Sequence, residues 1–371
     1  MIKDSQMNKT ESGVKQITLP PAIGKKDRNS NLELYRIIVM LAIVAHHFLV
    51  NSGLLEILSI SPLSDKSIFA YCFGVWGKTG INCFVLITGY FMCKSEITPR
   101  KFLKLLFEIY FYSIVINLIF IVSGYAQFSL GMIFFALFPV QGFSNNFVSC
   151  FLVYYLCIPF LNILIEHLSK RRHLLLVQML VIVYTIVGSI PLIGFEVEYI
   201  SWFAIMHLVA SYIRIYGFPI KMGHVAWLWL ALCFILLSFA SIIIILYLGR
   251  VDHWSFFLDS PNKFLAFATS ISLFMWFKDA KVKQSKIINR ISASAFGVLL
   301  IHANSDTMRQ WLWKDVLDVS GHYPSDCFMI YSVLSVLGIY MVCTIIDQLR
   351  IVIFEKPFFK LIDNSRFFDR F

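Results

Sequence analysis

The sequence predicts an all-α protein that crosses a membrane many times as a polytopic helical bundle. Hydrophobic residues make up 58% of the 371 residues and charged residues only 15%, whereas a soluble domain usually carries about 25% charged residues. Apolar runs such as 226–248 continue for about 20 residues without a charge, which is long enough to cross ~30 Å of hydrocarbon. We therefore expect a multi-pass protein of the plasma membrane.

Ten apolar segments, each bounded by charges or by Gly and Pro clusters, are candidate transmembrane helices. A further apolar piece, Phe128 to Val140, is too short to span the bilayer and contains Pro139, so we expect an interfacial or re-entrant segment there. The ten candidate spans lie near residues 32–51, 68–92, 103–123, 146–166, 174–192, 200–216, 224–248, 262–277, 292–308 and 328–353.

The distribution of Lys and Arg predicts that both termini are cytosolic. If the N-terminus is cytosolic and each of the ten spans crosses once, 25 of the 32 Lys and Arg residues lie on the cytosolic side, as the positive-inside rule requires. Counting residues 128–140 as an eleventh span would place the cluster from Lys278 to Arg290 outside. We therefore expect one membrane domain, residues 31–354, between a disordered cytosolic tail over residues 1–30 and a cytosolic tail over residues 355–371.

The net charge of +10 does not by itself indicate nucleic-acid binding. The basic residues lie in short loops between apolar runs, where anionic lipid headgroups are the expected partners. The eight cysteines lie mostly within apolar segments and show neither a CxxC motif nor the Cys and His spacing of a zinc site. We therefore predict membrane lipid as a partner, no nucleic acid, no metal site and no permanently bound cofactor.

Ionisable side chains within spans are costly to bury and are therefore functional candidates. The first span places Arg36 near its cytosolic end and His46 and His47 far along the same helix. At about 100° per residue, His47 lies about 20° from Arg36 after three turns, whereas His46 lies about 80° to the other side. Arg36 and His47 are therefore predicted to share one face, about 16 Å apart along the helix axis.

This spacing suits a long donor with phosphates at one end and a reactive acyl group at the other, as in coenzyme A thioesters. Arg36 would hold an anionic group entering from the cytosol, and His47 would act as general base on an acceptor hydroxyl. The structural alternative has equal weight at this point. In that alternative Arg36 extends to lipid headgroups, and the two histidines are satisfied by hydrogen bonds to neighbouring helices.

Arg36 and His47, separated by ten residues in the first span, resemble the hallmark of the acyltransferase family 3 membrane O-acyltransferases. Four later blocks follow in the family's order, although each is a loose pattern by itself. The sequence departs from the family in having Thr88 where Ser is common, and in lacking the Tyr that usually precedes the Leu-Ile-His of the last block. The blocks are Asn82 to Phe91, Tyr154 to Asn162, Trp202 with Ser211 to Tyr216, and Phe296 to His302.

The resemblance implies that residues 31–354 form an acyltransferase domain. Such a domain transfers an acyl group, usually acetyl from acetyl-CoA as cosubstrate, to a sugar hydroxyl. The acceptor is a cell-surface or extracellular polysaccharide or its lipid-linked precursor. Arg36 and His47 take the family's catalytic roles, and Arg36 also contacts the donor.

Four further residues are weaker candidates for the site. Lys78 is a possible contact for the donor phosphates or thioester, or a lysine at the outer interface. His46 and His302 are possible acceptor-site residues, and His302 is also a possible partner for His47 or a member of a hydrogen-bonded polar cluster. Trp311, in the outer loop after the ninth span, is a candidate for stacking on a glycan, although an interfacial aromatic belt explains it equally well.

Two other function classes fit a similar hydropathy profile. A transporter or flippase of lipid-linked sugars is typically built from repeats with unwound helices at the bilayer midplane, and the sequence shows no internal repeat. A non-catalytic scaffold of a polysaccharide-assembly complex is the third possibility. The transporter gives no reason for the spacing of Arg36 and His47, and the scaffold would be supported if both residues tolerate substitution.

Overall fold

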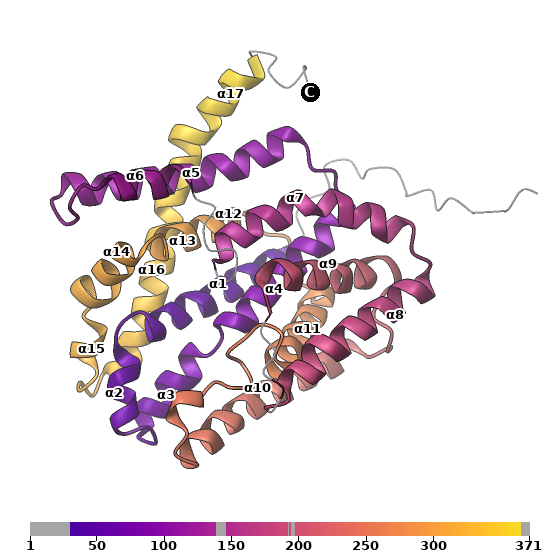
Figure 1. Cartoon of the computed structure of the whole chain (residues 1–371), viewed down its shortest axis with the longest axis horizontal. Helices are drawn as coiled ribbons and strands as arrows, with labels where there is room; N and C mark the ends of the chain where they lie inside the picture. Colours follow the sequence, from indigo (N-terminus) through magenta and orange to yellow (C-terminus); the bar gives the residue numbers. More distant parts are fainter. Residues whose placement is uncertain (1–29, 139–145, 192, 194–196, 365–371) are drawn as a thin grey trace, which may run out of the picture.

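The computed structural model describes residues 30–138, 146–191, 193 and 197–364 and is a bundle of helices, with no strand in these ranges (Figure 1). The all-α membrane fold is thereby confirmed. The tails expected at residues 1–29 and 365–371 lie outside the described residues. The α-helices are α1 (Ser30–Val50), α2 (Leu54–Ile60), α3 (Asp65–Gly74), α4 (Gly77–Met92), α5 (Pro99–Val122), α6 (Leu130–Leu137), α7 (Phe147–Glu166), α8 (Lys170–Val181), α9 (Tyr199–Tyr216), α10 (His224–Tyr247), α11 (Phe264–Asp279), α12 (Lys286–Ala293), α13 (Ala295–His302), α14 (Asp306–Arg309), α15 (Val319–His322), α16 (Phe328–Arg350) and α17 (Lys356–Asn364).

The described residues contain seven helical stretches long and apolar enough to span a membrane, so the predicted count of ten spans is not confirmed. The predicted spans at 200–216, 262–277 and 292–308 are not among the seven. They correspond to α9, to α11, which has 16 residues, and to α12–α14, of which α13 has eight. Helices α9, α11 and α13 are largely surrounded by protein, so they need neither the length nor the uniform apolarity that contact with lipid demands.

Two segments predicted to lie outside the spans are helical in the structure. The short piece expected to be interfacial or re-entrant forms α6, which lies beside α5 in Figure 1, and its last residues from 139 on lie outside the described residues. The tail expected from residue 355 starts as helix, because α16 continues through a π-helical turn, Ile351–Glu355, into α17.

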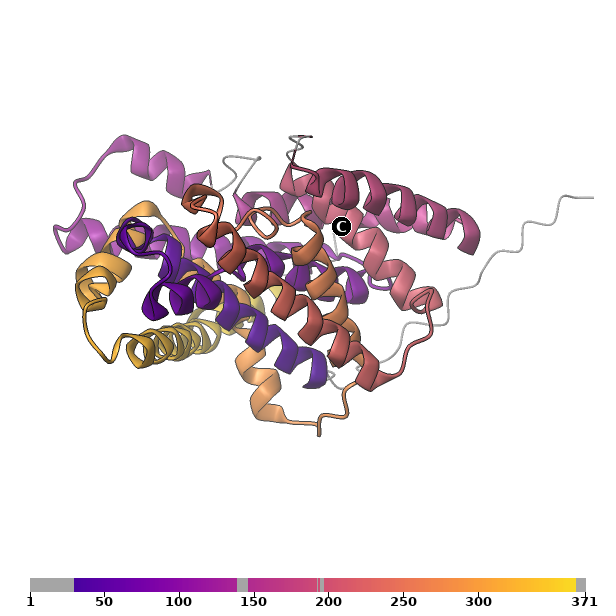
Figure 2. The same cartoon turned by 90° about the horizontal axis from the view of Figure 1, so that it is seen from below.

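Helices α1, α4, α9, α11 and α13 form the inside of the bundle, and the other long helices surround them (Figures 1 and 2). In the apolar window of α3–α4, 72% of the residues are buried, against 17% for α8 and for α10. The outer helices expose many large apolar side chains, such as Leu236 and Leu334. An apolar surface of this kind is stable in lipid and not in water.

Helix α1 runs antiparallel to α4 and α11 and parallel to α13. Near its start, the amide of Asn31 donates to the carbonyl oxygens of Phe277 and Lys278 at the end of α11, at 2.8 and 2.9 Å. Lys278 lies beside further cationic residues at this end, which we call the basic end of the bundle. The other end, at which α1 ends and α4 begins, we call the opposite end.

Glycines bring α3 and α4 into close contact with α1. A Cβ atom added at Gly77 would lie 2.2 Å from the ring of His46, and one added at Gly80 would lie 2.7 Å from Ile43. Only a residue without a side chain leaves room for this approach. The contact fixes the imidazole of His46 against the first turn of α4.

A Gly77→Ala variant is therefore expected to unfold at a lower temperature than the wild type. The added methyl group overpacks the contact with His46, which typically costs about 1–3 kcal/mol. Thermal unfolding of the purified protein in detergent measures the effect. Gly338→Ala in α16 is the matched control, because no atom lies within 4 Å of the added carbon; equal midpoints for the two variants would contradict the assignment.

A cluster of buried charges joins α5 to the basic end of α16. The guanidinium of Arg350 lies 2.9 Å from Asp347, 2.8 Å from Glu355 and 3.3 Å from Glu108. The hydroxyl of Tyr112 donates to Asp347 at 2.8 Å. The side chain of Arg350 is only 2% exposed. Such a cluster ties the last long helix to α5 at this end.

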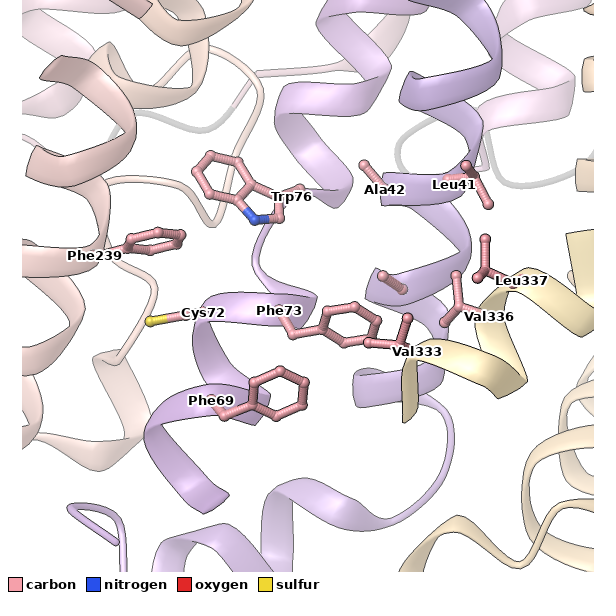
Figure 3. Close-up of a pocket in the computed structure, with 11 residues that line it drawn as sticks. Leu41, Ala42, Phe69, Cys72, Phe73, Trp76, Phe239, Val333, Val336 and Leu337 are labelled. Carbon is pink, nitrogen blue, oxygen red and sulfur yellow. The ribbon is translucent and has the colours of Figure 1, made fainter. Parts of the chain in front are cut away.

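One pocket of about 530 Å³ lies between α1, α3, α10 and α16, on the other side of α1 from the cavity described below (Figure 3). Carbon atoms form nearly all of its lining, with Phe69, Phe73 and Phe239 among its aromatic residues. Cys72 is the one titratable residue that lines it, and the lining offers no set of donors for a sugar. The polar chemistry of the bundle lies elsewhere.

Candidate active site

His47, near the end of α1, forms a hydrogen-bonded pair with His302, the last residue of α13. Nδ1 of His47 lies 2.8 Å from Nε2 of His302, and Nδ1 of His302 lies 2.6 Å from the carbonyl oxygen of Val298. The pairing joins two residues 255 positions apart in the sequence. Since Val298 and His302 are four residues apart, the carbonyl is presented by the same helix.

The geometry of the pair fixes which nitrogen is free to accept a proton. A carbonyl oxygen only accepts, so Nδ1 of His302 carries the hydrogen that reaches Val298. Nε2 of the neutral His302 ring must then accept from Nδ1–H of His47. Nε2 of His47 is left with its lone pair. His47 is thereby held in the tautomer that a general base requires.

Buried aromatic residues hold this pair in place. The Trp313 ring meets the His302 ring at 90°, with 6.3 Å between centroids, and meets Phe48 at 89° and 6.0 Å. Trp313, Phe48 and His302 are almost completely buried, whereas His47 is partly exposed. Burial of the supporting residues and exposure of the base is the arrangement expected of a preorganised site.

His47 opens onto a cavity of about 880 Å³ at the opposite end of the bundle. The cavity is lined by α1, α4, α5, α7, α9, α13 and α14. Its lining is about evenly divided between polar and apolar atoms, so it suits a hydroxyl-rich ligand better than a lipid chain. The polar residues that line it include His46, Lys78, Tyr199, Asn304, Asp306 and Arg309.

His46 lines the same cavity but is held differently from His47. Its Nδ1 lies 2.8 Å from the carbonyl oxygen of Gly74, which therefore receives its hydrogen. Nε2 of His46 is left as a second acceptor. The structure thus brings together His46, His47 and His302, and it assigns to His302 the role of partner to His47.

Arg36 does not line this cavity. Its guanidinium pairs with Glu33 at 2.9 Å, and the same carboxylate oxygen accepts from the hydroxyl of Ser292 in α12 at 2.5 Å. At the basic end, Glu33 thus joins Arg36 to Ser292 of α12. Helix α12 continues into α13, which carries His302 at its other end. Arg36 keeps an exposed side-chain fraction of 21%.

Two other predicted residues lie in different surroundings. Lys78 lines the cavity and donates to the hydroxyl of Tyr199 at 2.6 Å. Trp311 is not among the residues that line the cavity and instead packs edge-on against Phe120, with centroids 5.8 Å apart. This position does not support the predicted contact of Trp311 with a glycan.

Three of the later sequence blocks, in α4, α7 and α9, supply packing between these helices. Nε2 of His207 donates to the amide oxygen of Asn162 at 3.0 Å, and Nδ1 of the neutral ring accepts from the hydroxyl of Tyr154 at 2.9 Å. Trp202 donates to Asn82 at 2.7 Å. These residues position the helices around the cavity and do not line it.

Replacing His302 tests the pairing. In His302→Leu, Nδ1–H of His47 loses its acceptor, and we expect about a fivefold fall in kcat, since one hydrogen bond typically contributes about 1 kcal/mol. His302→Gln keeps an acceptor oxygen and is expected to retain more activity. Steady-state kinetics with both variants measure the difference; equal kcat values for His302→Leu and the wild type would exclude the pairing from catalysis.

Fold and site together define a helical membrane protein with a hydrogen-bonded histidine pair at a polar cavity. A family model described as an acyltransferase domain matches residues 29–346. The chain belongs to this family, acyltransferase family 3, and is a membrane acyltransferase; the resemblance is confirmed. Comparison with curated proteins and with solved structures gave no match.

Proposed function

We propose that the protein transfers an acetyl group from acetyl-CoA to a sugar hydroxyl of a cell-surface or extracellular polysaccharide, or of its lipid-linked precursor, in the plasma membrane. The observation that supports this most directly is the chain from Val298 through His302 to His47, which ends in a free Nε2 in a polar cavity. A sugar hydroxyl has a pKa far above 7, so a positioned base lowers the barrier to its attack.

In the proposed reaction, Nε2 of His47 removes the proton from the acceptor hydroxyl while its oxygen attacks the carbonyl carbon of the thioester. The imidazolium that forms is stabilised because its Nδ1–H donates to His302. The carbon–sulfur bond of the thioester breaks, and the coenzyme A thiolate leaves and takes up the proton from His47. Atoms and charges balance, and no other cofactor is needed.

The donor is proposed to enter from the basic end, which the positive-inside rule predicts to face the cytosol. Arg36 is the partly exposed cation on α1 at this end, and it lies about 16 Å from His47 along the helix. A donor with its phosphates near Arg36 would therefore extend along α1 toward the cavity. The acceptor would enter the cavity at the opposite end.

A labelling experiment with purified protein tests the donor and the reaction class. The protein is incubated with acetyl-CoA radiolabelled in the acetyl group and with surface polysaccharide from cells that lack the gene. We expect label in the polysaccharide that mild base releases, as an O-acetyl ester requires. Absence of label with acetyl-CoA, but transfer from a longer acyl-CoA, would refute acetyl as the donor group.

A further inference from the structure

A cationic residue stands beside the histidines without a negative partner. Lys78 is the second residue of α4, and its ammonium group lies 5.3 Å from the centre of the Tyr199 ring as well as 2.6 Å from its hydroxyl. Tyr199 is the first residue of α9 and is 4% exposed. The lysine is therefore held between two helices at the wall of the cavity.

Within the described residues, no carboxylate lies within 4 Å of Lys78. Two further charged residues that line the cavity, Arg309 and Asp306, form an ion pair with each other at 2.7 Å. Asp259, in the loop before α11, lies near enough for Lys78 to act on it electrostatically but forms no ion pair with it. Among the described residues that line the cavity, Lys78 and Arg309 face one carboxylate, Asp306, so positive charge is in excess by one.

An ammonium group has three N–H donors, and Tyr199 receives one of them. A charge within the low-dielectric interior of a membrane protein is costly unless a counter-charge offsets it. Tyr199 accepts the hydrogen bond from Lys78, so its own O–H remains to be donated to a second oxygen. The pair thus presents a positive charge and a hydroxyl donor to the same space.

The position of Lys78 places it with the acceptor and away from the donor phosphates. Gly77 packs against His46, so Lys78 lies at the level of the histidines and about three helical turns from Arg36. The sequence suggested a contact with the donor phosphates or the thioester. The structure puts these phosphates, if they lie near Arg36, at the other end of the bundle.

We propose that Lys78 and Tyr199 bind an anionic oxygen group of the acyl acceptor, so that the acceptor is an acidic glycan with a carboxylate or phosphate close to the acylated hydroxyl. This inference rests on the proposed function for the meaning of "acceptor". The anionic group belongs either to the sugar itself or to the phosphate that joins the sugar to a lipid carrier. Both sources present the same chemistry to Lys78.

Binding to the purified full chain in detergent, without any acyl donor, tests the proposal. The probes are two matched pairs: methyl glucuronide with methyl glucoside, and a polyprenyl phosphate with the corresponding polyprenol. Each is titrated while the thermal unfolding midpoint is followed, since a ligand that binds the folded state raises it. We expect the anionic member of one pair to bind more tightly than its neutral partner, and the pair that responds identifies the source.

Lys78→Gln is expected to weaken binding of the anionic probe by about 10- to 100-fold and to leave the neutral probe unchanged. Lys66→Gln is the matched control, because Lys66 lies on α3 at the same end and donates to the carbonyl of Pro324. Tyr199→Phe keeps the ring and removes the hydroxyl, so a smaller loss of affinity for the anionic probe is expected. This variant tests the site even if Lys78→Gln fails to fold.

The proposal is overturned if the wild type shows no preference within either pair, or if both Lys78→Gln and Tyr199→Phe keep the preference of the wild type. Because no acyl donor is present, this result does not depend on catalysis. Failure of acetyl transfer with intact, Lys78-dependent anion binding would refute the proposed function and leave the anion site standing.

Discussion

His47→Ala is expected to lower kcat for acyl transfer by about 10²- to 10⁴-fold, the range typical for loss of a general base. Among the described residues of α1, His47 is the one that both lines the cavity and forms a hydrogen bond to His302. The variant removes this side chain. Substrate binding uses other groups, so KM is expected to change much less than kcat. Steady-state kinetics with purified variant and wild type measure both constants.

His167→Ala provides the matched control for this variant. The ring of His167 donates to a carbonyl of its own helix, α7, at the basic end, and does not line the cavity. We expect its kcat to equal that of the wild type. A His47→Ala protein that unfolds at the wild-type temperature and yet keeps wild-type kcat would show that His47 is not the base.

Among the proposed variants, Arg350→Met is expected to lower the free energy of unfolding most, by about 3–5 kcal/mol. This is the range typical for breaking a buried ion pair by removing one partner. The substitution leaves Asp347, Glu355 and Glu108 close together without their shared cation. Asp347 is fully buried and Glu355 is 4% exposed, so water cannot replace the lost contacts. Thermal unfolding in detergent measures the effect.

Two further variants separate burial from charge. Arg100→Met removes a cation that pairs with Asp363 at the surface, where its side chain is 53% exposed, and is expected to change the midpoint little. Adding Asp347→Asn to Arg350→Met removes one of the stranded negative charges and is expected to restore part of the lost stability. If Arg100→Met and Arg350→Met had the same midpoint, the buried cluster would not be stabilising the fold.

The membrane fold was predictable because apolar length and loop charge are properties of the local sequence. The count of ten spans is not confirmed, because the predicted spans at 200–216, 262–277 and 292–308 are not among the seven helical stretches long and apolar enough to span a membrane in the described residues. Helices α9, α11 and α13 are mostly buried among other helices, and burial inside the protein removes the requirement for about 20 apolar residues. The sequence therefore identifies these segments as apolar but does not show whether each of them crosses the membrane.

The site was predictable where helical geometry alone determines the outcome. Arg36 and His47 were expected on one face of α1. In the structure Arg36 contacts α12 through Glu33, and His47 contacts His302 at the end of α13. Their catalytic roles stay predictions. The bond between His47 and His302 was only one of several possibilities, since residues 255 positions apart are brought together by packing that the sequence does not display.

Other features had no sequence signal that could identify them. Tyr199 begins a helix and looks like an interfacial aromatic residue until the structure places it against Lys78. Two tryptophans lie two positions apart in the π-helical segment Gln310–Val316 after α14, and the sequence favoured Trp311 as the functional one. The structure instead buries Trp313 against His302 and places Trp311 outside the cavity.

The central claim is that this membrane acyltransferase O-acetylates a surface polysaccharide through His47. NMR spectroscopy of the polysaccharide from cells with the gene deleted, restored, or restored as His47→Ala tests it most directly. The claim predicts O-acetyl signals in the restored strain and their loss in the deletion and in the His47→Ala strain with normal protein levels. The same O-acetyl signals in all three strains would contradict it.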